Sequence, residues 1–433
     1  MRKINSPILI FVDNLRRDYL VAEVIKNYFI KKKFKVFLIS RENYRYAIKF
    51  IKSDLIIFIK NYFNSIPKDI LANINKDTDI IVIDAEGAQT LERCKFWTEK
   101  YKIDVVEQTK RSKKIFLWNT DFLEYISNYT QTRPEKFHIS GSPKINLSIV
   151  AKGIEKHEIS KNIGFIGRFS AINDFADRSC LENSIVNFIA LDEFRHGAKG
   201  EIETLFIYLD IFNEIINSTD LIINLRPHPN EKIESYNYLK RKYKNRIKIS
   251  DPQEDFINWM YRQNKIICTP STSIVEPILN NIPLISVHKI VKSTTLRAYV
   301  EDMIDPFLTK VYKPENIKNL LDLIKAPNVE NLEDNKEYLE ARSKYYGDGK
   351  KIKKNAVSEI FDFFENSYTS EKNLLNFFNL LIYLFLNLKS FAKYLIFRNP
   401  KLKFTNDYNF FLVNKNNLSE KILHKLLNEK KNY

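Results

Sequence analysis

Short apolar runs alternate with longer amphipathic stretches along the first third of the chain. The runs are rich in Ile, Val, Leu and Phe and lie at residues 7–12, 35–40, 55–59, 79–84 and 114–118. Nearly continuous apolar runs are typical of strands buried on both faces, as in a parallel sheet covered by helices. The stretch at 17–31 has the apolar spacing of a helix. The pattern therefore predicts a doubly wound α/β domain that ends near residue 155.

The same pattern starts again after a polar stretch at 151–161. A long helix is predicted at 201–217, and buried strands are predicted at 162–166, 220–225, 246–249, 265–268 and 282–287. The fold class is therefore α/β, with two Rossmann-like domains at 1–155 and 156–345 and a cleft between them, as in GT-B-like proteins. Such pairs bind their ligand in that cleft, at the carboxyl ends of the strands.

Residues 346–433 are predicted to form a helical, amphipathic and basic C-terminal extension. Within it, 373–397 is mostly apolar, with a narrow polar stripe of Asn, Tyr and Ser. The apolar stretch is shorter than the ~20 residues that a membrane-spanning helix needs. We expect it to lie in a membrane interface, with residues 373–431 facing an anionic surface, or to pack on a partner. A helix packed as core across the cleft is the structural alternative.

Charge supports an anionic partner. The net charge is +16, and residues 371–433 carry 11 Lys and Arg against 4 Asp and Glu. Such an excess suits a membrane surface, a phosphorylated substrate or nucleic acid, and the structural alternative is a solvated basic surface. Nucleic acid is not expected, because basic and aromatic side chains are not interleaved as in a stacking platform.

Cysteine, histidine and glycine usage narrows the chemistry further. The three cysteines form no C-x-x-C pair and the six histidines form no zinc-binding pattern, so we expect neither a metal nor a disulfide framework. Only 9 glycines are present, and no glycine-rich phosphate loop occurs. The N-terminus does not read as a signal peptide, so a cytoplasmic protein is expected.

The sharpest local motif follows the strand predicted at 220–225. Arg226-Pro227-His228-Pro229 has two prolines that fix the backbone around a histidine at a strand's carboxyl end. An arginine beside a histidine suits a phosphate leaving group, because both can donate hydrogen bonds and the histidine can also donate a proton. The alternative is a rigid turn whose histidine only caps a neighbour.

A second motif follows the strand predicted at 265–268. It places hydroxyl groups at the expected start of a helix, on Ser271, Thr272 and Ser273, with Glu276 three residues further on. Backbone N–H groups and hydroxyls at a helix N-terminus form an anion site without glycine. Ser273 and Glu276 also fit a capping box, a structural role that can coexist with phosphate binding.

Two further loops carry polar residues at strand ends. Glu86 follows the strand at 79–84, and the loop after 162–166 offers Arg168, Asn173 and Asp174. Asp192 and His196 could also reach the cleft, but no pattern fixes their position.

These segments, in this order, resemble a family of bacterial surface-carbohydrate biosynthesis proteins that includes the retaining CMP-Kdo-dependent glycosyltransferases. The resemblance to polysialyltransferases and CDP-glycerol glycerophosphotransferases is more distant. It covers roughly residues 5–300 and is carried by Asp84-Ala85-Glu86-Gly87, Trp118, Gly141-Ser142-Pro143-Lys144, Arg226-Pro227-His228-Pro229-Asn230-Glu231 and Ser271-Thr272-Ser273-Ile274-Val275-Glu276-Pro277. It implies a metal-independent transferase with two Rossmann-like domains and a CMP-activated acidic sugar as donor.

The resemblance also implies roles for the nucleotide side of the site. Arg226 and His228 would hold the departing CMP phosphate, and the hydroxyls of residues 271–273 would complete its cradle. Glu231 and Glu276 would belong to the same nucleotide-binding set.

On the sugar side, the resemblance implies that Glu86 faces the acceptor and assists proton transfer. A retaining reaction needs a separate carboxylate that attacks the anomeric carbon. Asp174 is expected in that role, with Asp192 as its competitor. If neither is correctly placed, an inverting reaction with Glu86 as general base is the simpler mechanism.

The function expected from the sequence is transfer of Kdo or a related nonulosonic acid to a capsule, lipopolysaccharide or similar surface glycan. The chain would work at the inner face of the cytoplasmic membrane as a peripheral protein. One alternative is a phosphopolyol transferase that uses CDP-glycerol or CDP-ribitol. Another is a non-catalytic subunit of a glycan assembly complex.

Overall fold

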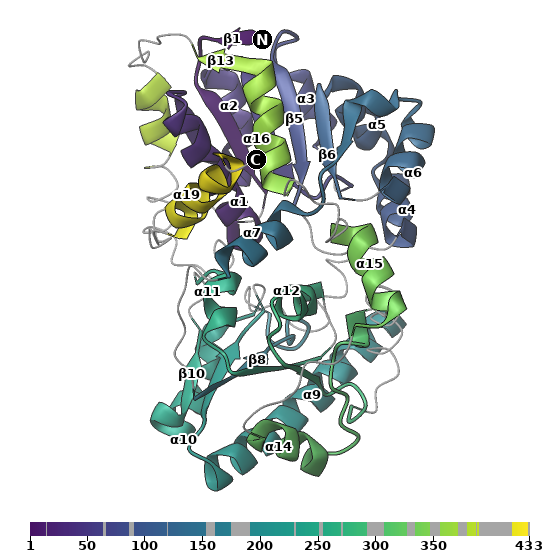
Figure 1. Cartoon of the computed structure of the whole chain (residues 1–433), viewed down its shortest axis with the longest axis vertical. Coiled ribbons are helices and arrows are strands. Elements are labelled where there is room, and N and C mark those ends of the chain that lie inside the picture. The colour runs from purple at the N-terminus through teal and green to yellow at the C-terminus, as the bar shows by residue number, and fades with distance from the viewer. Residues whose placement is uncertain are drawn as a thin grey trace. The chain divides into compact units, whose positions relative to one another are not determined.

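A computed structural model gives the fold of the chain (Figure 1). It describes all residues except 14, 64–65, 86–90, 119, 153–160, 175–190, 229–230, 251–253, 270–271, 292–306, 327–333, 347–355, 371–378, 387, 389–417 and 432–433. The chain divides into two compact units. Unit 1 comprises residues 1–154, 342–398 and 405–433, and unit 2 comprises 155–341 and 399–404.

Unit 1 is built on a six-stranded parallel sheet with the order β3-β2-β4-β5-β6-β7. The strands are β2 (Ile8–Val12), β3 (Val36–Ser40), β4 (Leu55–Lys60), β5 (Asp79–Asp84), β6 (Lys114–Leu117) and β7 (Phe137–Ile139). All five residues of β2 and all six of β4 are buried, as their unbroken apolar composition requires.

Helices connect these parallel strands. α1 (Leu15–Lys31) packs on β2, β3 and β4 and contacts α7 (Pro143–Ala151). A second set of helices, linked by mutual contacts, is α2 (Tyr44–Phe50), α3 (Lys68–Ala72), α4 (Leu91–Lys100), α5 (Lys102–Arg111) and α6 (Thr120–Thr130). Two 3-10 turns, η1 (Arg41–Asn43) and η2 (Pro134–Lys136), precede α2 and β7.

Late segments of the chain complete unit 1. The apolar face of α16 (Ala356–Ser367) is buried, and the Phe361 ring stacks on Tyr28 of α1 at 4.0 Å. α19 (Leu418–Lys431) packs on α1 and α7. Two short strands, β1 (Arg2–Ile4) and β13 (Tyr368–Ser370), pair in parallel.

This arrangement corrects the prediction that residues 346–433 form a separate extension. The described helices α16 and α19 belong to the core of unit 1, because their apolar faces cover α1. The division between the units falls after Ile154 and again between Ala341 and Arg342, inside α15 (Lys336–Tyr346). Most of 373–397 lies outside the described residues; its described part is helical at 379–386 and at Leu388.

Unit 2 has a five-stranded parallel sheet with the order β10-β9-β8-β11-β12. The strands are β8 (Asn162–Ile166), β9 (Ile222–Arg226), β10 (Ile247–Ile249), β11 (Lys265–Cys268) and β12 (Leu284–Ser286). In chain order the strands are arranged 3-2-1-4-5, the Rossmann order with its topological switch point between β8 and β11.

One face of this sheet packs against the long helix α9 (Leu191–Ser218). Ile163, Phe165, Ile223 and Leu225 are fully buried there in one apolar cluster with α9 residues. The other helices and 3-10 turns of unit 2 are η3 (Ile233–Tyr236), α10 (Asn237–Tyr243), η4 (Lys244–Arg246), α11 (Phe256–Tyr261), η5 (Thr272–Ile274), α12 (Val275–Leu279) and α14 (Ile317–Lys325).

Every strand predicted from the apolar runs is present, with ends that differ by at most two residues. The predicted helix at 201–217 begins ten residues earlier, at Leu191. The short strands β1, β7 and β13 were not predicted. Among the described residues, no helix is long and apolar enough to cross a membrane.

Candidate functional site

The candidate site of unit 2 lies at the carboxyl ends of its central strands. β8 pairs with β9 on one side and with β11 on the other, so the segments that follow these three strands emerge at one edge of the sheet. The edge includes the switch point between β8 and β11, where open α/β sheets bind their ligands. Three of the four motifs singled out in the sequence follow these strands.

Arg226, the last residue of β9, is held by groups around α11. Its Nη2 donates a hydrogen bond to the Glu254 carbonyl oxygen at 2.9 Å. The guanidinium carbon lies 5.3 Å from the Phe256 ring centroid and 5.7 Å from that of Trp259, within cation–π range. Burial lowers the pKa of this guanidinium, and Asp255 and Glu254 partly offset that effect.

The Nη1 atom of Arg226 is buried and has no hydrogen-bond partner among the described residues. Buried donors of this kind are rare in folded proteins and call for an explanation. A bound anion would supply the missing acceptor.

Glu231 fixes the turn that carries His228. Its Oε1 accepts hydrogen bonds from the backbone N–H groups of His228 at 3.0 Å and Phe169 at 2.7 Å. Its Oε2 accepts one from the Tyr236 hydroxyl. Glu231 therefore links the segments after β8 and β9 to η3. Both of its carboxylate oxygens accept hydrogen bonds from groups of the protein itself. The His228 side chain is half-buried at this edge.

Gly167 is required where these two segments meet. Its N–H donates to the Arg226 carbonyl oxygen at 2.7 Å. An added Cβ would lie 3.2 Å from that oxygen and 3.3 Å from Glu231 Oε2, closer than most Cβ contacts in proteins. The absent side chain thus lets the segment after β8 approach the Arg226-Pro227-His228 turn.

A second buried carboxylate holds the rest of this segment. Glu201 of α9 accepts hydrogen bonds from the backbone N–H groups of Ala171 at 2.8 Å and Ile172 at 3.2 Å. Burial raises the pKa of Glu201 to about 8, while these bonds and Arg168 lower it. Burial likewise raises the pKa of Glu231 to about 7. Neither Glu201 nor Tyr236 was singled out from the sequence.

These two carboxyls make the stability of unit 2 depend on pH. Both carboxyls have a higher pKa in the folded chain than the ordinary value of 4.5, so the folded chain binds these protons more tightly than the unfolded chain does. Their favourable contribution is therefore fully present below about pH 4.5 and is lost as the pH rises through 7 to 8. We expect thermal unfolding of unit 2 to show this fall, and Glu201→Gln to flatten it because the amide does not titrate. An unchanged slope in Glu201→Gln would contradict the assignment.

The other predicted residues after β8 are partly placed. The Asn173 amide donates to the Lys232 carbonyl oxygen at 3.0 Å, and Asp174 forms an antiparallel bridge with Glu231. Asp174 is buried and Arg168 is half-buried. Asp192 and His196 lie on α9, but their side chains are outside the described part of the chain. The choice between Asp174 and Asp192 as nucleophile therefore stays a prediction.

The hydroxyl motif after β11 differs from the expected helix start. A 3-10 turn at η5 precedes the five-residue helix α12, whose N-cap is Ile274, with no side-chain cap hydrogen bond. Ser273 lies inside the 3-10 turn, so the expected capping box is not the start of α12. Glu276 is buried and raises the pKa of Arg226. Ser271 and the side chain of Thr272 lie outside the described residues.

In unit 1, the segments of the predicted acceptor side are only partly described. Glu86 lies outside the described residues, directly after β5 and the buried Ala85. The Gly141-Ser142-Pro143-Lys144 segment has a structural role: Gly141 adopts a φ of 81°, and Ser142 is the N-cap of α7. Its hydroxyl accepts a hydrogen bond from the Ile145 N–H, and Pro143 occupies the first helical turn.

Buried charges lie at the carboxyl ends of the unit 1 strands, and of these only Asp84 belongs to a motif named from the sequence. Lys60 ends β4 and Asp84 ends β5, where they are register partners, and both are buried. Asp13 follows β2, is buried, and pairs with Arg41 at 3.2 Å. β2 and β4 flank the switch point of this sheet.

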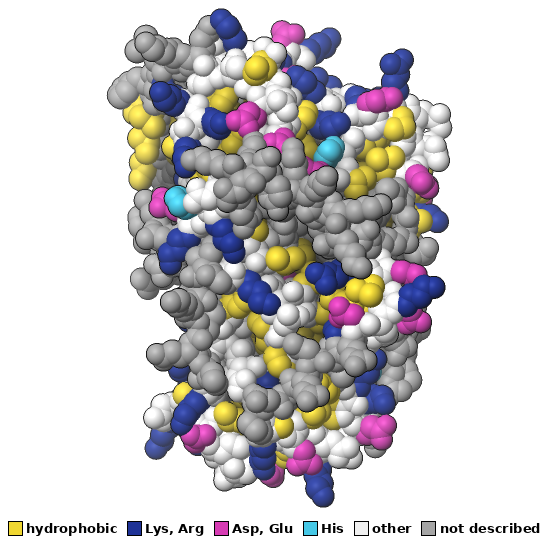
Figure 2. Space-filling view, viewed as in Figure 1, with side chains coloured by type: hydrophobic (Ala, Val, Ile, Leu, Met, Phe, Trp, Pro, Cys, Tyr) yellow, Lys and Arg dark blue, Asp and Glu magenta, His cyan; other side chains and the backbone are white. Residues whose placement is uncertain are grey.

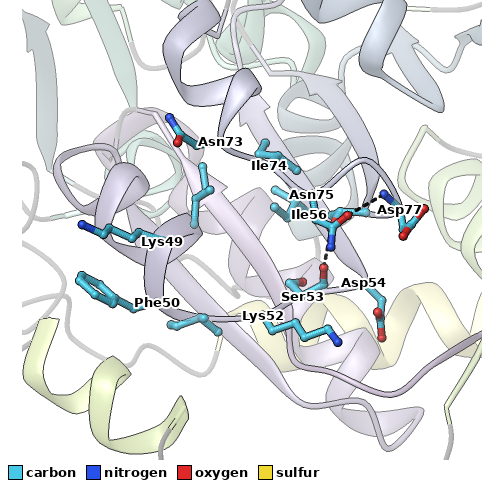
Figure 3. Close-up of a pocket in the computed structure, with 13 residues that line it drawn as sticks. Lys49, Phe50, Lys52, Ser53, Asp54, Ile56, Asn73, Ile74, Asn75 and Asp77 are labelled. Atoms are coloured by element: carbon cyan, nitrogen blue, oxygen red, sulfur yellow. Dashed lines mark hydrogen bonds between the residues drawn. The ribbon is translucent and has the colours of Figure 1, made fainter.

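A cavity of about 420 Å³ in unit 1 lies at the other end of the sheet (Figure 3). It is lined by residues that precede β4 and β5, among them Lys52, Asp54, Asn75 and Asp77. Both signs of charge line it, and the Asp77 N–H donates to the Asn75 side-chain oxygen at 3.0 Å. Its position at the amino ends of the strands separates it from the carboxyl-end segments described above.

Among the residues that the structure describes, no group of three or more His, Cys, Asp and Glu side chains could hold a metal ion.

No protein-family model matches the chain, and no curated protein matches its sequence. Solved structures do match. A variant of the wall teichoic acid polymerase TagF aligns with a TM-score of 0.51 and 13% identity, over 83% of this chain and 88% of that one. The chain has the GT-B fold. The expected α/β class with two Rossmann-like domains is thereby confirmed.

Epimerases also align, with lower scores. The UDP-GlcNAc 2-epimerase of Methanocaldococcus jannaschii has a TM-score of 0.41 and 12% identity, over 77% of this chain and 97% of that one. The enzyme from Neisseria meningitidis has a TM-score of 0.44 and 12% identity, over 83% and 100%.

Proposed function

We propose that the chain is a metal-independent glycosyltransferase that moves Kdo or a related nonulosonic acid from a CMP-activated donor to a bacterial surface glycan. The observation that carries the proposal is the Arg226-Pro227-His228 turn, which Glu231 holds at the carboxyl end of β9. This turn presents an arginine with an unsatisfied buried donor and a half-buried histidine. Preorganised donors of this kind can neutralise a leaving phosphate in place of a metal ion.

In this mechanism Arg226 and His228 hold the CMP phosphate, and the hydroxyls of residues 271–273 complete the cradle. Glu231 and Glu201 act as positioning residues, because their carboxylates accept hydrogen bonds from backbone N–H groups of the segment after β8. Glu276 contributes its charge beside Arg226.

In a retaining reaction Asp174 or Asp192 attacks the anomeric carbon, and the bond from that carbon to the phosphate oxygen breaks, so that CMP leaves with its electron pair. The acceptor hydroxyl then attacks the anomeric carbon of the glycosyl-enzyme, the bond from that carbon to the aspartate breaks and frees the carboxylate, and the hydroxyl proton passes to a base, for which Glu86 is the candidate. The inverting alternative uses Glu86 as base in a single displacement.

A phosphopolyol transferase that uses CDP-glycerol or CDP-ribitol is the second candidate. The similarity in fold to a wall teichoic acid polymerase supports this second candidate. Both reactions release CMP, but the polyol reaction breaks a phosphorus–oxygen bond of the donor's diphosphate. A non-catalytic subunit of a glycan assembly complex is the third candidate.

Turnover of alternative donors, measured with EDTA present, tests the proposal. We expect the chain to consume CMP-Kdo and to leave CDP-glycerol intact. Consumption of CDP-glycerol alone would support the second candidate, and consumption of neither would support the third.

The proposed acceptor is a membrane-bound glycan or glycolipid, so we place the chain at the inner face of the cytoplasmic membrane as a peripheral protein. The part of the predicted 373–431 segment that precedes α19 is basic and apolar in sequence, and it supports this placement.

A further inference from the structure

A short helical segment, described at residues 379–386 and 388 and here called the edge helix, is anchored on β3, one of the two outermost strands of the unit 1 sheet. The Tyr383 ring stacks on Phe37 of β3, with centroids 4.4 Å apart and an interplanar angle of 10°. Asn379 and Leu386 are buried. β3 is the first strand in the sheet order, so the edge helix lies at the β3 edge of the sheet.

The opposite side of the edge helix is apolar and exposed. The exposed fractions are 46% for Leu381, 47% for Leu384, 64% for Phe385 and 62% for Leu388. Their spacing of three and four residues places them on one face of a helix. Figure 2 shows hydrophobic side chains gathered at the upper left rim, where Figure 1 draws this segment. We call these four residues the apolar stripe.

Helix α2 lies on the same face of the sheet. Phe11 is the register partner of Ile39, and its ring stacks on Tyr44 of α2 at 4.4 Å. Phe37 is two residues from Ile39 on β3, so both point to the face that α2 covers. The stack of Tyr383 on Phe37 therefore places the edge helix on the α2 side of the sheet.

The exposed surface of α2 is aromatic and basic. Tyr46 and Phe50 are 44% and 46% exposed, and the Lys49 ammonium lies 5.4 Å from the Phe50 ring centroid. α2 contains no acidic residue. Apolar side chains accompanied by aromatic and basic side chains are typical of helices that lie in a lipid interface.

We propose that the apolar stripe and the exposed side of α2 dock unit 1 on an anionic lipid bilayer. Leu384, Phe385 and Leu388 enter the acyl boundary, and Lys49 remains at the level of the lipid phosphates. This proposal rests on the proposed function only in placing the acceptor at the membrane. Docking itself needs neither the nucleotide-sugar donor nor the transfer reaction.

A bilayer fits this surface better than a second copy of the chain does. A two-fold interface joins this surface to the same surface of the other copy, so the exposed Lys49 and Lys52 would find no acidic residue of α2 to pair with there. Like charges in such a contact cost free energy. The stripe side chains also carry no hydrogen-bonding group, whereas protein interfaces form about one hydrogen bond per 100–200 Å².

Cosedimentation of the full chain with lipid vesicles tests the proposal. We expect the chain to bind phosphatidylcholine vesicles that contain phosphatidylglycerol and to bind pure phosphatidylcholine much less. Phe385→Ser with Leu388→Ser should lower the bound-to-free ratio at least about tenfold, because two large apolar side chains lose their burial in lipid. The matched control is Phe96→Ser with Ile103→Ser, which removes side chains of unit 1 that are 61% and 65% exposed. This control should bind like the wild type.

Three results would overturn the proposal. They are no binding to anionic vesicles, equal binding by the stripe variant and the wild type, and a wild-type dimer that the stripe variant converts to monomer in light scattering. Leu388→Cys labelled with a polarity-sensitive dye provides a second readout, in which a blue shift on adding anionic vesicles is expected and its absence counts against docking. Donor turnover with a soluble acceptor is measured in parallel, so failure of docking and failure of the proposed chemistry are distinguishable.

Discussion

Replacing His228 by alanine should lower turnover of CMP-Kdo by about two orders of magnitude or more. The reason is that a single preorganised donor to a developing negative charge contributes a factor of that size. The backbone of the turn should remain, because Glu231 binds the N–H of residue 228 and not its ring. The measurement is the rate of CMP release, with circular dichroism to verify the fold.

The matched control for this variant is His424→Ala, which removes an exposed histidine on α19. Its turnover should equal that of the wild type. If His228→Ala also retained wild-type turnover, the histidine would have no part in the mechanism. That result would support the third candidate, a non-catalytic subunit of a glycan assembly complex.

Replacing Phe361 by alanine should destabilise unit 1 by about 3–5 kcal/mol, the usual cost of removing a buried aromatic ring. The ring is almost fully buried against Tyr28, whose hydroxyl donates to the Phe361 carbonyl oxygen at 3.2 Å. Hydrogen exchange of the amides in β2 and β4 reports the stability of this unit separately from unit 2.

Phe385→Ala is the control on the same late segment. This ring is 64% exposed, so its loss should change the free energy of unfolding by less than about 0.5 kcal/mol. Equal and small effects of the two substitutions would contradict the assignment of α16 to the core of unit 1.

The sheets could be predicted from the sequence because their strands are buried on both faces. Runs such as 55–59 leave no alternation of apolar and polar residues, and a parallel sheet covered by helices explains that pattern. β1 and β13 could not be predicted, because each has only three residues and exists through pairing with a strand more than 360 residues away. The packing of α16 on α1 could not be predicted either, because an apolar helical face does not indicate which element it packs against.

The candidate site could be predicted only where the signal is local. The two prolines around His228 restrict the backbone locally, which is a signal that the sequence alone shows. The hydrogen bond of Glu231 with Phe169 joins residues 62 positions apart in the sequence, so the local motif could not predict it. Glu201 is a similar case: it was the first residue of a predicted helix, and its contacts with residues 171 and 172 exist only in the folded unit.

Release of CMP from CMP-Kdo in the presence of EDTA tests the central claim most directly. The account predicts release by the wild-type chain without added metal, a rate at least about tenfold lower for Arg226→Ala because a charged donor to the phosphate is lost, and no consumption of CDP-glycerol. Consumption of CDP-glycerol with CMP-Kdo untouched, or CMP release that Arg226→Ala leaves unchanged, would contradict it.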